Sequence, residues 1–422
     1  MAADGNLAGL EAARAEAYAL PLEKLNPAQP ALFQADAMWP IFERLRAEDP
    51  VHYCEEHEFG PYWSITKYND IMEIDTNHQV FSSDYMLGGI TLAGGQSTMD
   101  PLPMFIAMDP PKHDVQRKAV SPAVAPPNLA LLAPQIRERA GQILDSLPIG
   151  VEFDWVDLVS KELTGMTLAT LFDMPQEDRR QLVYWSDVVT AAPGQGLIDT
   201  LEQKMAIFTE YHAYFTKLWN AKVNAPPAGD LISMLAHSPA TRDMEPREFF
   251  GNVVLLTVGG NDTTRNTISG SILALNQNPD QYAKLRADPS LIPSMVSETI
   301  RWQTPLAHMR RTALSDFEFR GKLIKKGDKV VMWYVSGNRD EDVIDRPNDY
   351  IIDRERPRQH ISFGFGIHRC VGNRLAELQL TIIWEEILKR FPEVIVTAPP
   401  KRVYSSFVKG YETLPVVIPS RT

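Results

Sequence analysis

The spacing of hydrophobic residues predicts a chain that is mainly helical. Apolar residues recur every three or four positions in four segments, and glycine- and proline-containing breakers separate these segments. We expect successive packed helices over residues 131–147, 154–172, 176–189 and 197–223. The same periodicity predicts a long helix that includes residues 253–275 and a final amphipathic helix over residues 373–391.

Two other regions have the alternating pattern of β-structure. Residues 51–68 alternate and are interrupted by Gly60-Pro61, which is typical of a hairpin, and short β-type runs follow residue 314, including residues 329–334. The chain contains neither a repeat of fixed period nor a composition break that resembles an interdomain linker. The pattern therefore predicts a mainly α fold with small β-sheets, in a single large domain over residues 1–422 whose first 30 residues form an N-terminal arm.

Composition and charge narrow the possible functions. The chain has 422 residues, 44% of them apolar, and its 42 Lys and Arg against 54 Asp and Glu give a net charge of −12, which argues against a nucleic-acid partner. The two cysteines, Cys54 and Cys370, form no disulfide framework and favour a reducing compartment. Because neither a signal peptide nor a membrane span is visible, we expect a cytoplasmic protein.

The most informative segment is a glycine-rich loop around the second cysteine. Cys370 lies in the string FGFGIHRCVG, from Phe363 to Gly372, directly before the predicted final helix. Free N–H groups and the positive end of the helix dipole stabilise a thiolate there, and the glycines let a flat partner approach the backbone closely. We therefore expect Cys370 to be a ligand. The alternative is a buried thiol, the interpretation that we favour for Cys54.

A pair of adjacent glycines interrupts the predicted long helix. Gly259 and Gly260 precede Asp262, Thr263 and Thr264, and each glycine costs about 1 kcal/mol relative to Ala in a helix interior. Close approach of a ligand would explain why the glycines are present. The alternative is that the threonine hydroxyls merely bond back to their own helix carbonyls.

The string around Cys370 resembles the haem-binding loop of the cytochrome P-450 superfamily and matches its pattern Phe-Gly-x-Gly-x-His-x-Cys-x-Gly at every defined position. The resemblance extends over nearly the whole chain. It implies a cytochrome P-450 fold with haem b between the long central helix and the cysteine loop, which includes Phe363. It also implies Cys370 as the thiolate ligand of the iron, His368 directed at a haem propionate, and a monooxygenase that uses O2, because a thiolate ligand favours O–O cleavage.

Two further superfamily motifs lie upstream of this loop. The resemblance implies that Gly259, Asp262 and Thr263 belong to the oxygen-binding groove, where the acid and the alcohol deliver protons. Glu298 and Arg301 match the Glu-x-x-Arg pair that supports the cysteine loop. Without this context such a pair at i and i+3 would more often be a solvated surface pair.

The resemblance also implies a set of basic residues around the haem propionates. His113 and Arg117 match the His-x-x-x-Arg clamp, and their spacing places them on one helix face. Arg311 matches the third member of the clamp, with Arg310 as a competing candidate one residue away. For each of these residues a solvated surface charge is the alternative.

Four segments of the chain are similar to the bacterial terminal (ω) hydroxylases of medium-chain alkanes and fatty acids. Their sequences are VGGNDTTRNTISG, IRWQTPLAHMRRTA, VVMWYVSGNRD and HISFGFGIHRCVGNRLAELQL. A terminal C–H bond is stronger than the methylene bonds beside it, so the protein must present only the end of a small, apolar, linear substrate through a narrow channel. The implied entrance is the loop 83–108 with the turn 192–197. That loop contains no Lys or Arg, which mildly favours neutral chains. The implied channel lining is Leu255, Val258, Leu306, Phe407 and Val408.

The chain contains no flavin or iron–sulfur motif. We therefore expect electrons from NAD(P)H to arrive through a 2Fe-2S ferredoxin and its ferredoxin reductase. A local basic patch would suit an acidic ferredoxin; its expected members are Lys112, Arg117, Lys118, Arg369 and Arg374. Two alternatives remain, the same chemistry on a terpene or steroid and a non-catalytic haem-binding sensor, and the Asp262-Thr263 pair argues against the sensor.

Overall fold

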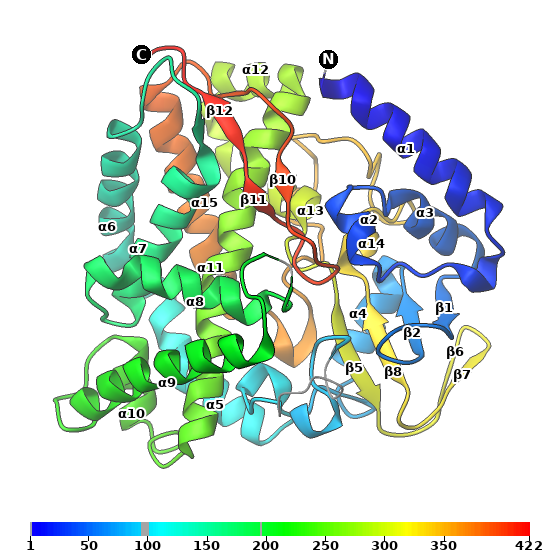
Figure 1. Cartoon of the computed structure of the whole chain (residues 1–422), viewed down its shortest axis with the longest axis horizontal. Coiled ribbons are helices and arrows are strands. Elements are labelled where there is room, and N and C mark those ends of the chain that lie inside the picture. The colour runs from blue at the N-terminus through cyan, green and yellow to red at the C-terminus, as the bar shows by residue number, and fades with distance from the viewer. Residues whose placement is uncertain (1, 94–100, 195) are drawn as a thin grey trace.

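The computed structural model describes residues 2–93, 101–194 and 196–422 and is mainly helical, with small sheets of which the largest lies on one side (Figure 1). The long helices lie where the hydrophobic periodicity predicts them, with shifted ends. They are α6 (Pro126–Asp145), α7 (Lys161–Leu171), α8 (Arg179–Thr190), α9 (Leu201–Val223), α11 (Pro246–Gln277) and α15 (Asn373–Arg390). The other helices are α1 (Ala2–Ala19), α2 (Pro30–Gln34), α3 (Trp39–Glu48), α4 (Tyr68–Thr76), α5 (Lys112–Val120), α10 (Leu231–His237), α12 (Pro279–Ala287), α13 (Ile292–Gln303) and α14 (Tyr334–Gly337).

Local chemistry explains the shifted helix ends. α6 begins earlier than predicted because Pro126 occupies its first position, where a helix does not need the N–H that proline lacks. α9 begins later because the Thr200 hydroxyl accepts a hydrogen bond from the Gln203 N–H at 3.2 Å and caps the helix. Before α7, Phe153–Asp154 forms strand β4 and Val156–Ser160 forms a π-helical turn.

α11 runs through the centre of the molecule and organises the other helices around it. α7, α8, α13 and α15 all pack against it (Figure 1). Its C-terminal half is buried on nearly every side, whereas Leu255, Leu256, Val258 and Gly260 are only partly buried and Gly259 is exposed. The middle of α11 therefore faces a space that other side chains do not fill.

The sheets form the smaller part of the fold. β1 (Val51–Cys54) and β2 (Tyr62–Ile65) form the predicted hairpin, and β2 runs parallel to β8 (Lys329–Met332). This sheet has the order β1-β2-β8-β5-β3, with β5 at Met309–Ala313 and β3 at Phe81–Ser82. The smaller sheets join β6 (Phe317–Phe319) to β7 (Lys322–Ile324), β12 (Pro415–Val417) to β4 and β9 (Ile395–Val396), and β10 (Lys401–Arg402) to β11 (Tyr411–Thr413).

The main hydrophobic core lies among the helices. It contains Trp155, Trp185 and Trp384, each almost fully buried. α1 occupies most of the predicted arm and packs against α3, with Ala17 buried. Among the described residues, no helix has both the length and the apolar character needed to span a membrane.

Candidate functional site

A cavity of about 880 Å³ lies between α11, the cysteine loop, β5 and the segment 404–407. The predicted site residues that line it are Arg117, Leu255, Val258, Gly259, Thr263, Leu306, Arg311, Phe363, His368, Cys370 and Phe407. The predicted residues that lie outside its lining are His113, Asp262, Glu298, Arg301 and Val408. Residues that are nearly 300 positions apart in the sequence thus meet around one cavity.

The cysteine loop is held in a fixed conformation by backbone contacts. The Cys370 N–H donates to the Phe363 carbonyl at 2.8 Å, which closes the loop on itself. Gly366 has a φ of +65°, and a Cβ there would lie 2.7 Å from the Asp75 carbonyl oxygen, so glycine is required on both counts. The loop therefore delivers Cys370 to the cavity immediately before α15 begins.

The Cys370 side chain is accessible from the cavity but lies deep in the molecule. Burial raises the pKa of its thiol, and the Gly372 N–H, Arg117 and Arg369 oppose this effect. Cys54, by contrast, is buried and contacts the Leu25 carbonyl at 3.6 Å, in agreement with the buried thiol predicted for it. Only Cys370 is in a position to meet a ligand in the cavity.

Four basic side chains converge beside the cysteine loop. The rings of His113 and His368 lie 4.4 Å apart, and both nitrogens of His368 and Nε2 of His113 are buried without a partner among the described residues. Burial lowers the pKa of His368, and the positive charges of Arg311, His113 and Arg117 lower it further. A cluster of donors with few acceptors fits a ligand that carries carboxylates, as haem does.

The structure separates the two adjacent arginines of β5. Arg311 lines the cavity, whereas Arg310 turns to the opposite side and donates to the Leu87 carbonyl at 2.9 Å. Successive residues of a strand point to opposite faces, which explains the difference. The geometry therefore favours Arg311 over Arg310 as a propionate partner.

Asp75 is a buried acid of α4 that the sequence analysis missed. Its carboxylate accepts from Arg311 at 2.7 Å, from the Tyr334 hydroxyl at 2.8 Å and from the Phe365 N–H at 2.8 Å. It thus ties α4, β5, α14 and the cysteine loop together. No local signal distinguishes Asp75 from an ordinary helix-surface acid, because its partners lie more than 230 residues away.

The surroundings of the two adjacent glycines of α11 differ. A Cβ at Gly260 would lie 2.6 Å from Leu168 Cδ2, so a larger residue there would displace this side chain of α7, and Gly260 also lines the cavity. A Cβ at Gly259 would meet no described atom within 4 Å, and Gly259 opens onto the cavity. The Thr263 hydroxyl lines the cavity and donates to the Gly259 carbonyl at 2.8 Å, which is the back-bonding considered above.

Asp262 lies on the other side of α11, fully buried. Its Oδ1 accepts from Ser186 at 2.8 Å and Asn261 at 2.9 Å and lies 3.2 Å from Arg265, while Oδ2 has no partner among the described residues. Burial raises the pKa of this carboxyl, and the charge of Arg265 opposes the shift. A proton is therefore held more readily at Asp262 than at an exposed aspartate.

Glu298 and Arg301 form a fully buried pair, which excludes the surface-pair alternative. Their two hydrogen bonds are each 2.8 Å long, and Arg301 also donates to the carbonyls of Asn338 and Pro347. Asn338 in turn accepts from the Ile361 N–H at 2.8 Å, just before the cysteine loop. The pair thus connects α13 to the base of the loop through one shared residue.

The predicted apolar lining is present with one exception. Val408 does not line the cavity, because it is buried and forms a β-bridge with Leu306, which does line it. Residues 94–100 of the predicted entrance loop and residue 195 of the predicted entrance turn lie outside the described residues. The described parts of the loop contribute Tyr85, Leu102, Met104 and other residues to the lining.

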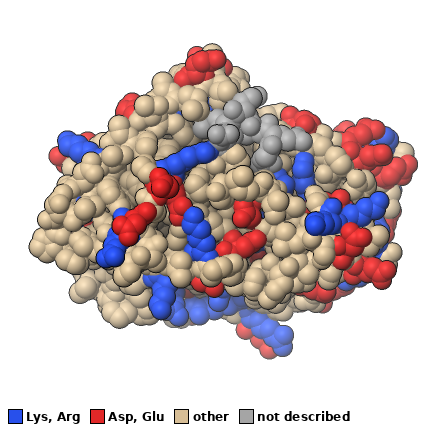
Figure 2. Space-filling model, turned by 90° about the horizontal axis from the view of Figure 1, so that it is seen from below, with Lys and Arg blue, Asp and Glu red and all other residues tan. Residues whose placement is uncertain are grey.

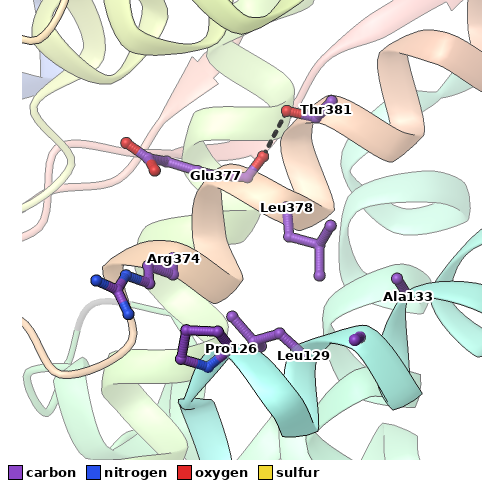
Figure 3. A pocket seen from close by; sticks show the side chains of 8 residues that line it. Pro126, Leu129, Ala133, Arg374, Glu377, Leu378 and Thr381 are labelled. Carbon is purple, nitrogen blue, oxygen red and sulfur yellow. Dashed lines mark hydrogen bonds between the residues drawn. The ribbon is translucent and has the colours of Figure 1, made fainter.

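A second, shallow groove of about 380 Å³ lies on the surface between α6 and α15 (Figure 3). Pro126, Leu129 and Ala133 line it from α6, and Arg374 and Leu378 line it from α15. α15 follows Cys370 directly, so the groove lies along the helix that the cysteine loop leads into.

Comparison with known proteins gives matches over almost the full length. The family model described as cytochrome P450 matches residues 161–409. Linalool 8-monooxygenase of Pseudomonas putida is 35% identical over 94% of this chain and 99% of its own length. A methyl-branched lipid omega-hydroxylase of Mycobacterium tuberculosis is 32% identical over 89% of this chain and 90% of its own length.

Solved structures share the architecture. A cytochrome P450-153 from Novosphingobium aromaticivorans has a TM-score of 0.87 and 45% identity, covering 93% of this chain and 99% of its own. CYP153D17 from a Sphingomonas species has the same TM-score and 48% identity, covering 94% of this chain and 100% of its own. These matches confirm the mainly helical fold and the monooxygenase class predicted from the sequence. The chain belongs to the cytochrome P450 family of haem-dependent monooxygenases.

Proposed function

We propose that this P450 hydroxylates the terminal carbon of medium-chain linear substrates, either n-alkanes or fatty acids. The observation that carries the proposal is the apolar part of the lining of the cavity that also contains Cys370, to which Leu255, Val258, Leu306 and Phe407 contribute. These four side chains offer no polar group to a hydrocarbon chain, so along them the shape of the cavity would restrict which carbon is presented for reaction. The similarity to a lipid omega-hydroxylase and to two P450-153 structures supports the proposal.

Haem b, the cofactor of the family, supplies the activation of O2 when it is bound. We assign Cys370 as the sulfur ligand of its iron. We assign His113, Arg117, Arg311 and His368 as the partners of its two propionates. The convergence of these donors, and the buried ring nitrogens that have no partner among the described residues, support the assignment.

Thr263 and Asp262 are assigned to proton delivery. The Thr263 hydroxyl lines the cavity and can hold a water molecule there. Asp262 can hold a proton at Oδ2, which has no partner in the described part of the chain. Because the Asp262 carboxyl does not line the cavity, transfer from it requires rotation of its side chain or an intervening water.

The electron donor in this proposal is a 2Fe-2S ferredoxin served by a ferredoxin reductase. Of the predicted basic patch, Lys112, Lys118, Arg369 and Arg374 are exposed, and Lys112 forms an ion pair with Glu248 at 2.6 Å. Arg374 also borders the groove between α6 and α15 (Figure 3). On the face drawn in Figure 2, Lys and Arg are interspersed with Asp and Glu, in keeping with local rather than broad attraction of an acidic partner.

A titration of the haem-loaded protein with linear alkanes, fatty acids and a bulky terpene tests the proposal. The haem Soret band reports displacement of a water ligand from the iron. We expect the largest high-spin shift at one linear chain length, and a terminal alcohol as the main product of turnover. A response only to the terpene would contradict the proposal and favour a substrate of the kind named for the linalool relative.

A further inference from the structure

A lysine lines the cavity from an element that the sequence analysis did not connect with the substrate. Lys204 lies in the first turn of α9 and lines the cavity together with Val189, Thr190 and Phe208. The α8–α9 region covers α11 in front in Figure 1. Lys204 therefore reaches the cavity from α9, and not from the cysteine loop or the basic cluster beside it.

The Lys204 ammonium has two neutral partners and no acidic one. Nζ donates to the carbonyl oxygens of Val189 at 3.0 Å and Ala191 at 2.8 Å, and an ammonium group carries three donors. No acidic side chain among the described residues forms an ion pair with it. Glu58, the acidic residue among those that line the cavity, makes no contact with it within ion-pair distance. A partly buried cation that lacks a counter-ion is free to receive one from a ligand.

The contacts of Lys204 connect it to the N-terminal part of α11. Its Nζ lies 5.8 Å from the ring of Phe208, and that ring lies 6.0 Å from the ring of Phe250 on α11. Phe250 precedes Gly259 by nine residues, or about 13 Å along the helix axis. The α11 residues between them that line the cavity are Val254, Leu255, Leu256 and Val258.

Lys204 also differs from the other Lys and Arg side chains that line the cavity. These are Arg117 and Arg311, which lie beside His368 and are assigned above to the propionates. Both are on the cysteine side. A cation without an acidic partner among the described residues, beside apolar side chains in a cavity that the proposed iron ligand also lines, forms a site for a molecule with one anionic end and one hydrocarbon end.

We propose that Lys204 is a specificity-determining residue that binds the carboxylate of a linear fatty acid, which points the methyl end toward the cysteine side. This inference rests on the proposed terminal hydroxylation and selects fatty acids over n-alkanes. Burial lowers the pKa of Lys204 to about 8, so the side chain remains largely protonated at pH 7. The competing role is structural, because Lys204 also caps the C-terminal carbonyls of α8.

The experiment compares dodecanoate with n-dodecane in the haem-loaded protein at pH 7, with dissociation constants from the Soret shift. The variants are Lys204→Met, Lys204→Arg and, as a control, Lys217→Met, which removes an exposed lysine from the same helix. In Lys204→Met we expect the ratio of the dodecanoate constant to the dodecane constant to rise by a factor of roughly 10 to 150, the factor that corresponds to the loss of a hydrogen bond to a charged group. Lys217→Met should leave the ratio unchanged, and Lys204→Arg should largely restore it.

The outcomes separate this inference from the proposed function. An unchanged ratio in Lys204→Met, with a normal dodecane response, would overturn the role of Lys204 and leave terminal hydroxylation standing. A wild-type protein that responds to neither linear ligand would contradict the proposed function itself. If Lys204→Met fails to fold, Lys204→Gln retains a donor for the α8 carbonyls, and its ratio decides the question in the same way.

Discussion

The two ends of the cavity are built in opposite ways. At the cysteine end, one continuous loop is fixed by hydrogen bonds, including Cys370 N–H to Phe363 and Phe365 N–H to Asp75. In the apolar part of the lining, side chains come from α8, α9, α11 and the segment 404–407, and α9 also contributes the charged Lys204. The comparison teaches that the proposed chemistry depends on local backbone geometry, whereas the proposed selectivity depends on packing between distant segments.

The largest effect expected at the cysteine end is loss of the iron ligand. Cys370→Ala should abolish the thiolate-type haem spectrum, because no other cysteine is among the described residues that line the cavity. Cys54→Ala is the matched control and should retain the spectrum, since Cys54 is buried away from the cavity. Absorption of the reduced, carbon monoxide-bound protein measures both. A thiolate spectrum in Cys370→Ala would overturn the ligand assignment.

The buried support of the loop should carry the next largest effect. Glu298→Gln removes the charge that faces Arg301 and should lower the free energy of unfolding by about 3–5 kcal/mol, because it leaves a buried cation without its counter-ion. Glu43→Gln at the exposed Arg14–Glu43 pair should cost less than about 1 kcal/mol. Denaturant unfolding of the two variants checks this difference, and equal losses would show that burial of the pair has no special role.

A substitution of Thr263 tests its proposed role in proton delivery. Thr263→Ala should reduce product formed per NAD(P)H consumed by roughly tenfold or more, with peroxide released, because a proton donor is lost from the cavity. Thr216→Ala is the control: its hydroxyl makes the same back-bond, to the His212 carbonyl at 2.8 Å, but does not line the cavity. Tight coupling in Thr263→Ala would contradict the assigned role.

A smaller effect is expected at the surface of the cysteine end. Lys118→Glu or Arg374→Glu should slow reduction by ferredoxin several-fold at low salt and leave haem loading intact. The difference should shrink at high salt, where exposed charges are screened. Lys217→Glu, on the α9 surface, serves as the control. If neither substitution changes the reduction rate at any salt concentration, the ferredoxin does not dock at this site.

The smallest effect is expected at the apolar end. Phe407→Ala widens the cavity and should lower the ratio of terminal to internal alcohol by about twofold to fivefold, because the chain is held less closely. Val408→Ala, beside it but outside the lining, should affect stability without a change in this ratio. Gas chromatography of the products measures the ratio. An identical ratio in both variants would show that Phe407 does not guide the chain.

The sequence by itself determined the helices, the hairpin and the cysteine loop. Each depends on neighbours in the chain: periodic apolar residues, turn residues, or a contiguous motif such as FGFGIHRCVG. The sequence left the choice between Arg310 and Arg311 open. The choice depends on which side chains of β5 point toward the cavity, and only the pairing of β5 with β8 and β3 fixes this orientation.

Only the tertiary structure decided the contributions of isolated residues. In the sequence Asp75 resembles an ordinary surface acid of a helix, and only the fold brings Arg311, Tyr334 and the cysteine loop to it. Likewise, only the fold brings Leu168 close to Gly260. Lys204 resembles a solvated lysine in sequence, and it becomes part of the cavity because α9 folds back on the end of α8. Local patterns record interactions between residues close in the chain, whereas burial and the loss of counter-ions arise only when distant segments pack together.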